Sequence, residues 1–402
     1  MTEINNNLNN IQGITPEIVK AIELYCEGIS KMFDNNATVK SNLLKQIKKN
    51  FTGLEHQELK GGISGSVSNM SSCILLSSKL EEWNYINTFL HEFTHQIAKN
   101  SRIDEEDMQV IEYNLGLKMG QDDRTDSMFV PCSSWTIDGN NYAFDRGAAM
   151  MLFDEWITEW LANKFSGLQN VELKTDNNGN FRIKTSHGYD GSNIMNLMEL
   201  AFGEAQLVDL LLGVTLTEEE RNTIIPLKGF QKMDQEFSSE LMSNEEKEEL
   251  VNSSRYIKNP SITIYMSYLI GKYNEEKNPE LSNEHLERLM NLLTRLYSQK
   301  FVNSIDSISN ENDALKFAGQ LSVIQNSIIW NNDMDKMLSC EYYTRYVEMV
   351  KMLKEKCTTN NIDINLSSLE KTPEEMFEYF SNLEKRYGHG EKKELSGTNK
   401  KM

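Results

Sequence analysis

The chain has 402 residues, of which 39% are hydrophobic and 25% are charged, proportions that allow a sizeable buried core. Six prolines and 22 glycines are too few for collagen-like proteins or for disordered proteins rich in these residues. The formal charge is −19, from 41 Lys and Arg against 60 Asp and Glu. Because so acidic a surface repels phosphate backbones and anionic lipids, we expect neither nucleic acid nor a membrane among the partners.

Cysteine usage and the N-terminal residues bear on the cellular compartment. The five cysteines are widely spread and form no C-x-x-C pair, a pattern typical of reduced thiols rather than of a disulfide framework. The first residues lack the basic start and apolar run of a secretory signal, and no stretch approaches roughly 18 consecutive apolar residues. We therefore expect a soluble, cytoplasmic protein, with signal-independent export as the alternative. The cysteines are Cys26, Cys73, Cys132, Cys340 and Cys357.

The first helix is expected to begin after Thr15, which can cap it, with Pro16 at the first helical position. Its amphipathic pattern continues to about Met32. Glycines and then serines are frequent over residues 61–72, and the apolar run 73–76 follows them. This order predicts turns followed by a short buried strand.

The next helix carries a motif with chemical meaning, His91-Glu92-Phe93-Thr94-His95. Residues four apart share one helical face, so His91 and His95 can present two imidazoles to a single metal. Glu92 lies about 100° round the helix, where its carboxylate can reach a water on that metal. Apolar steps of 3, 4, 3 and 4 predict the buried face of this helix. They join Trp83, Ile86, Leu90, Phe93 and Ile97.

Two imidazoles do not complete a zinc site, because catalytic zinc usually takes three protein ligands and a water. The third ligand is expected from the helix around residues 148–165, which is apolar almost all round yet carries Glu155 and Glu159 on one face. An unpaired buried charge is costly, so two such carboxylates need partners. A divalent cation and an imidazole N–H would satisfy both. An ordinary solvated acidic face is the alternative, which the flanking tryptophans disfavour.

His-Glu-x-x-His at residues 91–95, followed by Glu-x-x-Thr-Glu at residues 155–159, resembles the gluzincins, the thermolysin-like clan of zinc metallopeptidases. The resemblance covers about residues 60–215, and its two motifs are specific. It implies a zincin-like core, a small sheet with the active-site helix. It also implies that the strand before this helix resembles the clan's edge strand, which pairs with an extended peptide.

The resemblance assigns roles to individual side chains. It implies that His91, His95 and Glu155 bind one zinc ion per chain. Glu92 would be the general base and later the proton shuttle. Glu159 would accept a hydrogen bond from His91 and so orient its ring.

Departures from related patterns limit these assignments. A metzincin would carry Gly and His where this chain has Ala98 and Ser101, which excludes that class. Trp156 stands where a Gly often follows the third ligand in the gluzincins. Asp154 is the alternative third ligand, as in the aspzincins, although the pair of Glu155 and Glu159 explains more residues.

A hairpin and a further helix are expected after the second motif. Residues 171–185 have two short apolar–polar alternations around Asn178-Gly179, the signal of a tight turn. The helix is expected over residues 193–212.

The loop at residues 186–191 lies between this hairpin and this helix, where it could overhang the metal. Families in the clan supply a Tyr or His that stabilises the oxyanion, so we expect Tyr189 or His187 to have this role. The alternative is a loop that only caps the next helix. Tyr142 and Tyr85 are weaker candidates. The remaining histidines have no motif around them and are expected at the surface: His56, His285 and His389.

The chain after about residue 216 shows mainly helical patterns. Reciprocal capping-box spacing occurs at Thr217–Glu220, Ser243–Glu246 and Thr372–Glu375. Apolar stripes there step by three and four, which indicates helix packing rather than a cofactor site. We therefore expect an α+β, predominantly helical protein. Its parts would be an N-terminal helical segment (1–59), a metallopeptidase core (60–216), a helical region (217–387) and a loose polar tail (388–402).

The function expected from these features is hydrolysis of peptide bonds in a peptide or protein substrate by a zinc-activated water. Two other functions stay open. One is a helical interaction protein that keeps a zincin fold without turnover, for which the large acidic helical region leaves room. The other is a zinc hydrolase acting on a non-peptide amide.

Overall fold

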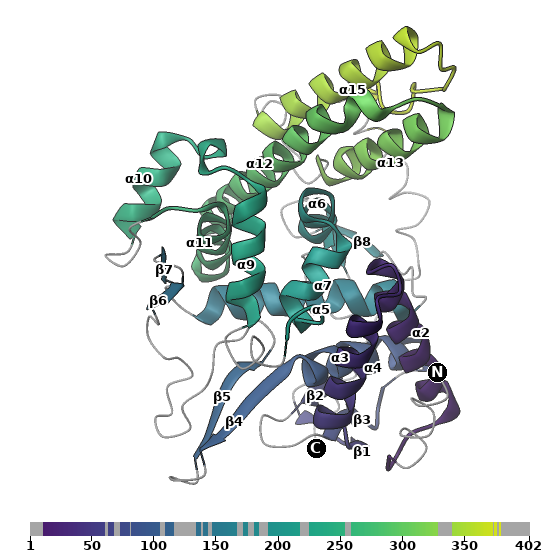
Figure 1. The fold of residues 1–402 in the computed structure, drawn as a ribbon, viewed down its shortest axis with the longest axis vertical. Helices are drawn as coiled ribbons and strands as arrows, with labels where there is room; N and C mark the ends of the chain where they lie inside the picture. Colours follow the sequence, from purple (N-terminus) through teal and green to yellow (C-terminus); the bar gives the residue numbers. More distant parts are fainter. Residues whose placement is uncertain are drawn as a thin grey trace, which may run out of the picture. The chain divides into compact units, whose positions relative to one another are not determined.

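A computed structural model gives the fold of the chain (Figure 1). The described part is predominantly helical and contains one small three-stranded sheet, which confirms the helix-rich α+β class at this level. The described residues are 11–60, 63–67, 73–80, 82–104, 109–115, 134–137, 140–143, 147–166, 172–175, 181–184, 192–217, 225–253, 259–328, 340–372, 374–375 and 378.

The chain divides into two compact units. The first comprises Met1–Gln169 and Ser186–Phe301, and the second comprises Asn170–Thr185 and Val302–Met402. Both sequence motifs lie in the first unit. The domain boundaries drawn from the sequence stay a prediction.

The first described helix, α2 (Pro16–Met32), has the bounds that the sequence predicts. Thr15 caps it, because its Oγ1 accepts a hydrogen bond from the Ile18 N–H at 3.4 Å. The following helix, α3 (Ala37–Asn50), is capped in the same way by Asn36. Both helices pack against α4, the helix that carries the first motif.

The three-stranded sheet has the order β1-β3-β2, with β1 (Gly53–Gln57) parallel and β2 (Gly65–Val67) antiparallel to β3 (Cys73–Ser77). The predicted buried strand is therefore present as β3. The expectation that it is an edge strand is wrong, because β1 and β2 pair with its two sides. Ile74 and Leu76 are fully buried, as a central strand requires. The edge strand that packs against α4 is β2.

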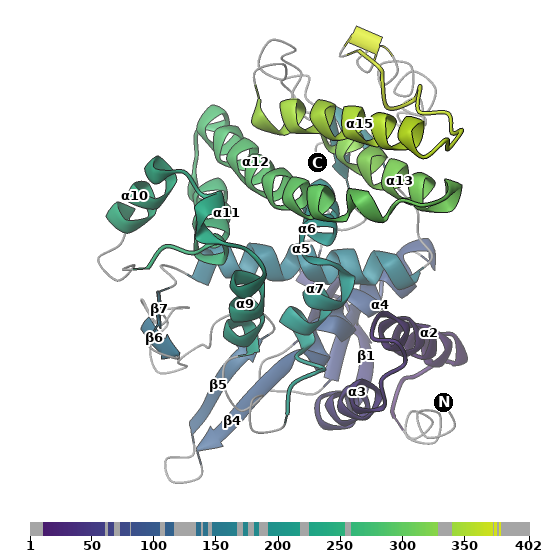
Figure 2. The same cartoon turned by 45° about the horizontal axis from the view of Figure 1, so that its top comes forward.

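The two motif helices pack against each other along their length (Figure 2). One is α4 (Glu82–Ile97), which also covers β2 and β3, and the other is α5 (Gly147–Ser166). Phe93 anchors α4, with its ring centroid 5.2 Å from that of Phe51 and 5.7 Å from that of Tyr25. Burying a side chain of this size contributes about 1.5–3 kcal/mol to stability. Because Phe93 is the central residue of the first motif, this packing holds α4 in place at the motif itself.

Two antiparallel strand pairs lie between α4 and α5 in the sequence. They are β4 (Lys99–Asp104) with β5 (Gln109–Leu115), and β6 (Ser134–Ile137) with β7 (Asn140–Ala143). No pattern in the sequence predicts either pair. The structure describes the backbone of these strands but not their side chains.

The helix expected over residues 193–212 is instead two helices, α6 (Ser192–Phe202) and α7 (Glu204–Leu212). Gly203 separates them with a φ of +92°, a conformation that a residue with a side chain rarely adopts. The apolar period continues across the break, which is why the pattern alone predicts one helix.

The remaining described elements of the first unit are helical, as predicted. The capping box at Ser243 is confirmed, since its N–H donates to Glu246 Oε2 at 2.7 Å and its Oγ accepts from the Glu246 N–H at 3.1 Å. One of these helices, α11, packs against α5. The elements are α9 (Ile225–Glu236), η2 (Ser239–Leu241), α10 (Asn244–Ser253), α11 (Ile262–Glu275) and α12 (Pro279–Ser304).

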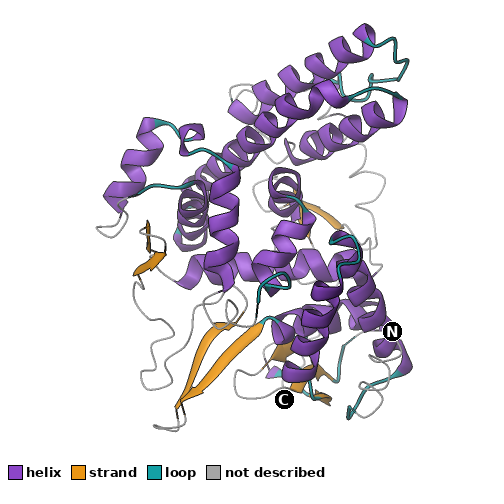
Figure 3. Cartoon of the chain, viewed as in Figure 1, coloured by secondary structure: helices purple, strands orange, loops and turns teal. Residues whose placement is uncertain are grey.

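The second unit contains the predicted hairpin, β8 (Glu172–Thr175) paired with β9 (Phe181–Lys184), although its turn lies outside the described residues (Figure 3). The capping box at Thr372–Glu375 is confirmed by reciprocal bonds of 2.8 and 3.3 Å, whereas Glu220 of the box at Thr217 is not described. Described helices of this unit beyond the end of α12 include η3 (Ile305–Ser307), α13 (Glu311–Ile328) and α15 (Glu341–Thr359).

Searching the described residues finds no helix that combines the length and apolar composition needed to cross a membrane. Among the described residues, Cys26, Cys73, Cys340 and Cys357 are not joined in a disulfide, and Cys132 is not described.

Candidate metal centre

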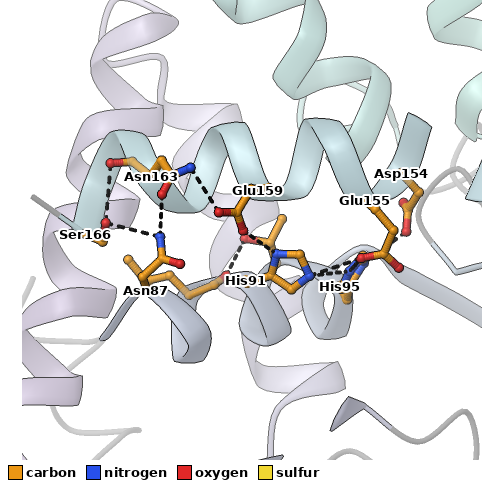
Figure 4. Close-up of polar contacts among 10 residues, drawn as sticks. Asn87, His91, His95, Asp154, Glu155, Glu159, Asn163 and Ser166 are labelled. Carbon is orange, nitrogen blue, oxygen red and sulfur yellow. Dashed lines mark hydrogen bonds and ion pairs between the residues drawn. The ribbon is translucent and has the colours of Figure 1, made fainter. Parts of the chain in front are cut away.

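The two motifs meet where α4 faces α5 (Figure 4). His91 and His95 extend from α4, and Glu155 and Glu159 extend towards them from α5. Both helices run past this point with their i, i+4 faces opposed, so each contributes a row of polar side chains to an otherwise apolar interface. His91, His95 and Glu155 form a group that could hold a metal ion.

The three potential ligand atoms form a nearly regular triangle. Nε2 of His91 lies 3.2 Å from Nε2 of His95, and each of these nitrogens lies 3.2 Å from Oε2 of Glu155. Corners of a tetrahedron that lie about 2.0–2.1 Å from its centre are about 3.3 Å apart. The triangle therefore has the size of three protein ligands around a four-coordinate zinc ion.

The outer nitrogens of both imidazoles contact carboxylates. Nδ1 of His91 donates a hydrogen bond to Oε2 of Glu159 at 3.0 Å, and Nδ1 of His95 lies 3.0 Å from Oδ2 of Asp154. An ionised carboxylate accepts hydrogen bonds but has no proton to donate, so Nδ1 of His91 carries the hydrogen of its bond to Glu159. In the neutral imidazole the lone pair is then on Nε2, the atom that faces the triangle.

Two electron-rich atoms, Nε2 of His91 and Oε2 of Glu155, thus face each other at 3.2 Å in a buried place beside Nε2 of His95, with His91 and His95 only 4% and 6% exposed. Such atoms repel unless a cation lies among them. Two imidazole nitrogens and one carboxylate oxygen suit zinc or another late first-row metal better than calcium or magnesium, which prefer oxygen alone. Two imidazoles and one carboxylate therefore fit zinc, the metal that the two sequence motifs suggest.

The pKa of His91 reflects the same crowding. Burial lowers this pKa, but the hydrogen bonds to Glu155 and Glu159 and the charge of Glu92 raise it by more, to about 10. A proton on this ring is the simplest cation that relieves the repulsion when no metal is bound. A metal ion bound by this group would therefore compete with that proton.

Glu92 follows His91 on the face of α4 that contacts β2, and its charge acts on the His91 ring. It is buried, and a Cβ built on Gly65 would lie 2.6 Å from its Cγ and 2.8 Å from its Oε1. Contacts this short do not occur, so the carboxylate has its place only because β2 carries no side chain at residue 65.

Other site residues predicted from the sequence have different surroundings. Asp154, the alternative third ligand, contacts the Nδ1 of His95 rather than the triangle. Tyr85 has its hydroxyl 3.1 Å from Nε2 of His56. Tyr189 and His187 lie outside the described residues, as does the side chain of Tyr142.

Trp156, the departure from the clan's usual glycine, is buried against α11. Its ring centroid lies 5.9 Å from that of Tyr273. The indole therefore packs α5 against α11, which gives a packing reason for the large residue after Glu155.

The surface histidines have mixed outcomes. His56 is exposed, as predicted, and its ring stacks on Tyr85. The prediction for His285 is wrong, because this residue is half-buried on α12 and burial, together with the charge of Arg288, lowers its pKa. His389 is not described.

Three residues near the centre were missed by the sequence analysis: Gly65, Asn87 and Asn163. Asn87 precedes His91 by four residues and Asn163 follows Glu159 by four, so continuing the i, i+4 spacing of each motif would have found both. Gly65 carries no such signal, because it comes from a separate strand.

A comparison with protein-family models, curated proteins and solved structures finds no significant match for this chain.

Proposed function

We propose that the protein is a zinc-dependent metallopeptidase of the gluzincin type. The observation that carries the proposal is the triangle of 3.2 Å formed by Nε2 of His91, Nε2 of His95 and Oε2 of Glu155. These atoms come from two helices, with Glu155 lying 60 residues after His95 in the sequence, and each motif supplies the residue types that the clan requires. Zinc is the proposed metal, with one ion per chain.

The proposed roles are those that the gluzincin resemblance implies for these side chains. His91, His95 and Glu155 hold the metal, which when bound supplies a Lewis acid that polarises a carbonyl and lowers the pKa of a water to about 7. Glu92 takes one proton from the attacking water and later gives it to the departing amine, so that the proton is conserved through the peptide cleavage. Glu159 fixes the ring of His91.

The surrounding fold supports a zincin-like core. A small sheet lies against α4, the helix with the first motif, and α5 brings the second motif to the same point. Residues from the loop at 186–191, Tyr189 or His187, are the proposed partners of the oxyanion. The substrate would be a peptide or protein, and we propose a cytoplasmic location without nucleic-acid or membrane partners.

Metal analysis tests the first half of the proposal. The purified protein should bind about one zinc per chain, and His95→Ala should remove it. His56→Ala is the matched control, because this exposed histidine lies outside the triangle, and it should keep the metal. A protein that binds no zinc at micromolar concentration would refute the proposed centre.

Peptide cleavage tests the second half. The zinc-loaded protein should cleave members of a peptide library, and Glu92→Gln should abolish cleavage while zinc stays bound. Zinc without peptide cleavage would favour the interaction protein or, if small non-peptide amides are hydrolysed, the other zinc hydrolase.

A further inference from the structure

Polar contacts between α4 and α5 continue beyond the three potential ligands (Figure 4). Asn163 of α5 donates from Nδ2 to Oε1 of Glu159 at 3.1 Å, while Oε2 of the same carboxylate accepts from His91. Asn87 of α4 donates from Nδ2 to Oδ1 of Asn163 at 2.7 Å and, at 3.4 Å, to Oγ of Ser166. One chain of hydrogen bonds thus joins Asn87 to His91.

This chain has only one consistent direction. The carboxylate of Glu159 accepts hydrogen bonds and donates none, so Asn163 must turn its NH2 group towards it. The amide oxygen of Asn163 then faces Asn87, which must donate in turn. Rotating either amide by 180° would bring two NH2 groups, or two oxygens, against each other. Each amide is therefore fixed by its neighbour.

Burial makes the loss of one of these hydrogen bonds costly. Asn87 is completely buried, and Glu159 is 2% exposed. Asn163, which supplies the donor, is half-buried, but the carboxylate of Glu159 has little contact with water, so an oxygen without its partner would pull Glu159 towards another donor. Because the second oxygen of Glu159 holds Nδ1 of His91, any such rotation would also turn the imidazole.

We propose that Asn163, itself fixed by Asn87, is a positioning residue of the metal centre that acts through Glu159 on His91. The inference rests on the metal centre proposed above. Asn163 touches none of the three ligand atoms, and its effect is to hold the Nε2 of His91 in the direction where the triangle closes. Asn87 acts on the same path, one step further from the metal.

Zinc affinity of the purified protein, measured by competition with a chelator, tests this role. Asn163→Leu keeps the side-chain volume but removes the donor to Glu159, and it should weaken zinc binding about 10- to 100-fold. Asn42→Ala is the control, because Asn42 is an asparagine in the same unit whose Nδ2 donates hydrogen bonds of 2.9 and 3.1 Å to the carbonyls of Val214 and Leu216, away from the metal centre. It should lower thermal stability and leave zinc affinity within about threefold.

A double-variant cycle separates positioning from simple helix packing. Asn87→Leu should weaken zinc binding by itself, and the double variant Asn87→Leu/Asn163→Leu should bind zinc no more weakly than Asn163→Leu alone, because both changes act on one path. Simple packing defects would instead leave zinc affinity near that of the wild type. With cobalt in place of zinc, the visible absorption of Asn163→Leu should shift, since it reports ligand geometry, whereas that of Asn42→Ala should not.

The results distinguish this inference from the metal centre itself. If wild-type protein binds zinc and His95→Ala does not, the centre stands. The positioning role is then overturned if Asn163→Leu stays within about threefold of the wild type, or if Asn42→Ala loses as much affinity. Should Asn163→Leu fail to fold, Asn87→Leu and its cobalt spectrum decide by the same criteria.

Discussion

The carboxylate of Asp154 lies 3.0 Å from Nδ1 of His95, on the side of the ring away from the metal triangle. Its neighbour in sequence, Glu155, lies 3.2 Å from the other ring nitrogen. Two adjacent acidic residues therefore contact opposite sides of one imidazole, which holds the ring between them. Asp154 is fully buried, so this contact is kept away from water.

The different positions of these two carboxylates predict different effects of removing them. Glu155→Ala should abolish zinc binding, because it deletes one of three ligands. Asp154→Ala should weaken binding only about 10- to 100-fold, because it deletes an orienting group. Zinc titration against a chelator measures both. Equal and complete loss in the two variants would make Asp154 a ligand, as the aspzincin alternative holds.

Zinc affinity should rise with pH. The pKa of His91 in the metal-free protein is raised to about 10, so below that pH zinc must displace a proton from this ring. The apparent affinity should increase about tenfold per pH unit between pH 7 and 9, with about one proton released per zinc. Calorimetry in buffers of different ionisation enthalpy measures the proton. Zinc binding that is independent of pH over this range would contradict the protonated state.

The raised pKa of His91 also makes the stability of the metal-free protein depend on pH. A histidine whose pKa is higher in the folded state, about 10 against 6.5, stabilises the fold fully below pH 6.5 and loses this contribution as pH rises through 10. The metal-free protein should therefore lose stability between pH 7 and 10, as measured by urea unfolding. The zinc-loaded protein should lack this particular loss, because the metal replaces the proton. If the unfolding free energies of the metal-free and zinc-loaded proteins changed equally with pH, the protonation of His91 would not be the cause.

Much of the helical fold could be predicted because its signals are local. Thr15 with Pro16 marks the start of α2, and the box at Ser243 marks the start of α10. The break at Gly203 was missed, because the backbone changes direction there without any change in the apolar period. The central position of β3 was also missed, since strand order depends on pairing between segments that no local pattern specifies.

Residue spacing also predicts only part of the candidate site. The spacing of His91 and His95 predicts a shared helical face, and the structure brings Glu155 to that face. Spacing does not say which ring nitrogen meets which carboxylate, so Asp154 could be proposed as a ligand although it contacts Nδ1. That choice depends on how α5 is rotated against α4, which is a property of the packed interface.

Zinc should stabilise the first unit, because its ligands come from two helices that the metal joins. At a free zinc concentration about 100 times the dissociation constant, the gain is about 2.7 kcal/mol, which corresponds to a rise in melting temperature of roughly 5 °C or more. Thermal unfolding with zinc and with a chelator measures it. His95→Ala should remove the zinc-dependent part, whereas His56→Ala should retain it. A melting temperature insensitive to zinc in the wild type would argue against a metal that bridges α4 and α5.

Gly65→Ala should separate metal binding from catalysis. The new Cβ would lie 2.6 Å from Cγ of Glu92, so the proposed general base must move, while the three ligand atoms are on other side chains. Displacing a catalytic group by about 1 Å can reduce turnover about 100-fold. The variant should therefore bind one zinc with nearly wild-type affinity and cleave a peptide-library substrate 10- to 100-fold more slowly.

The neighbouring residue provides the control for this change. Ser66 is on the same short strand, and successive strand residues point to opposite faces, so Ser66→Ala should change neither zinc content nor turnover. A lower kcat with little change in KM is expected for Gly65→Ala, because the displaced group acts on the proton rather than on substrate binding. Wild-type turnover in this variant would show that Glu92 does not need its present position, and loss of zinc would show that β2 supports the ligands instead.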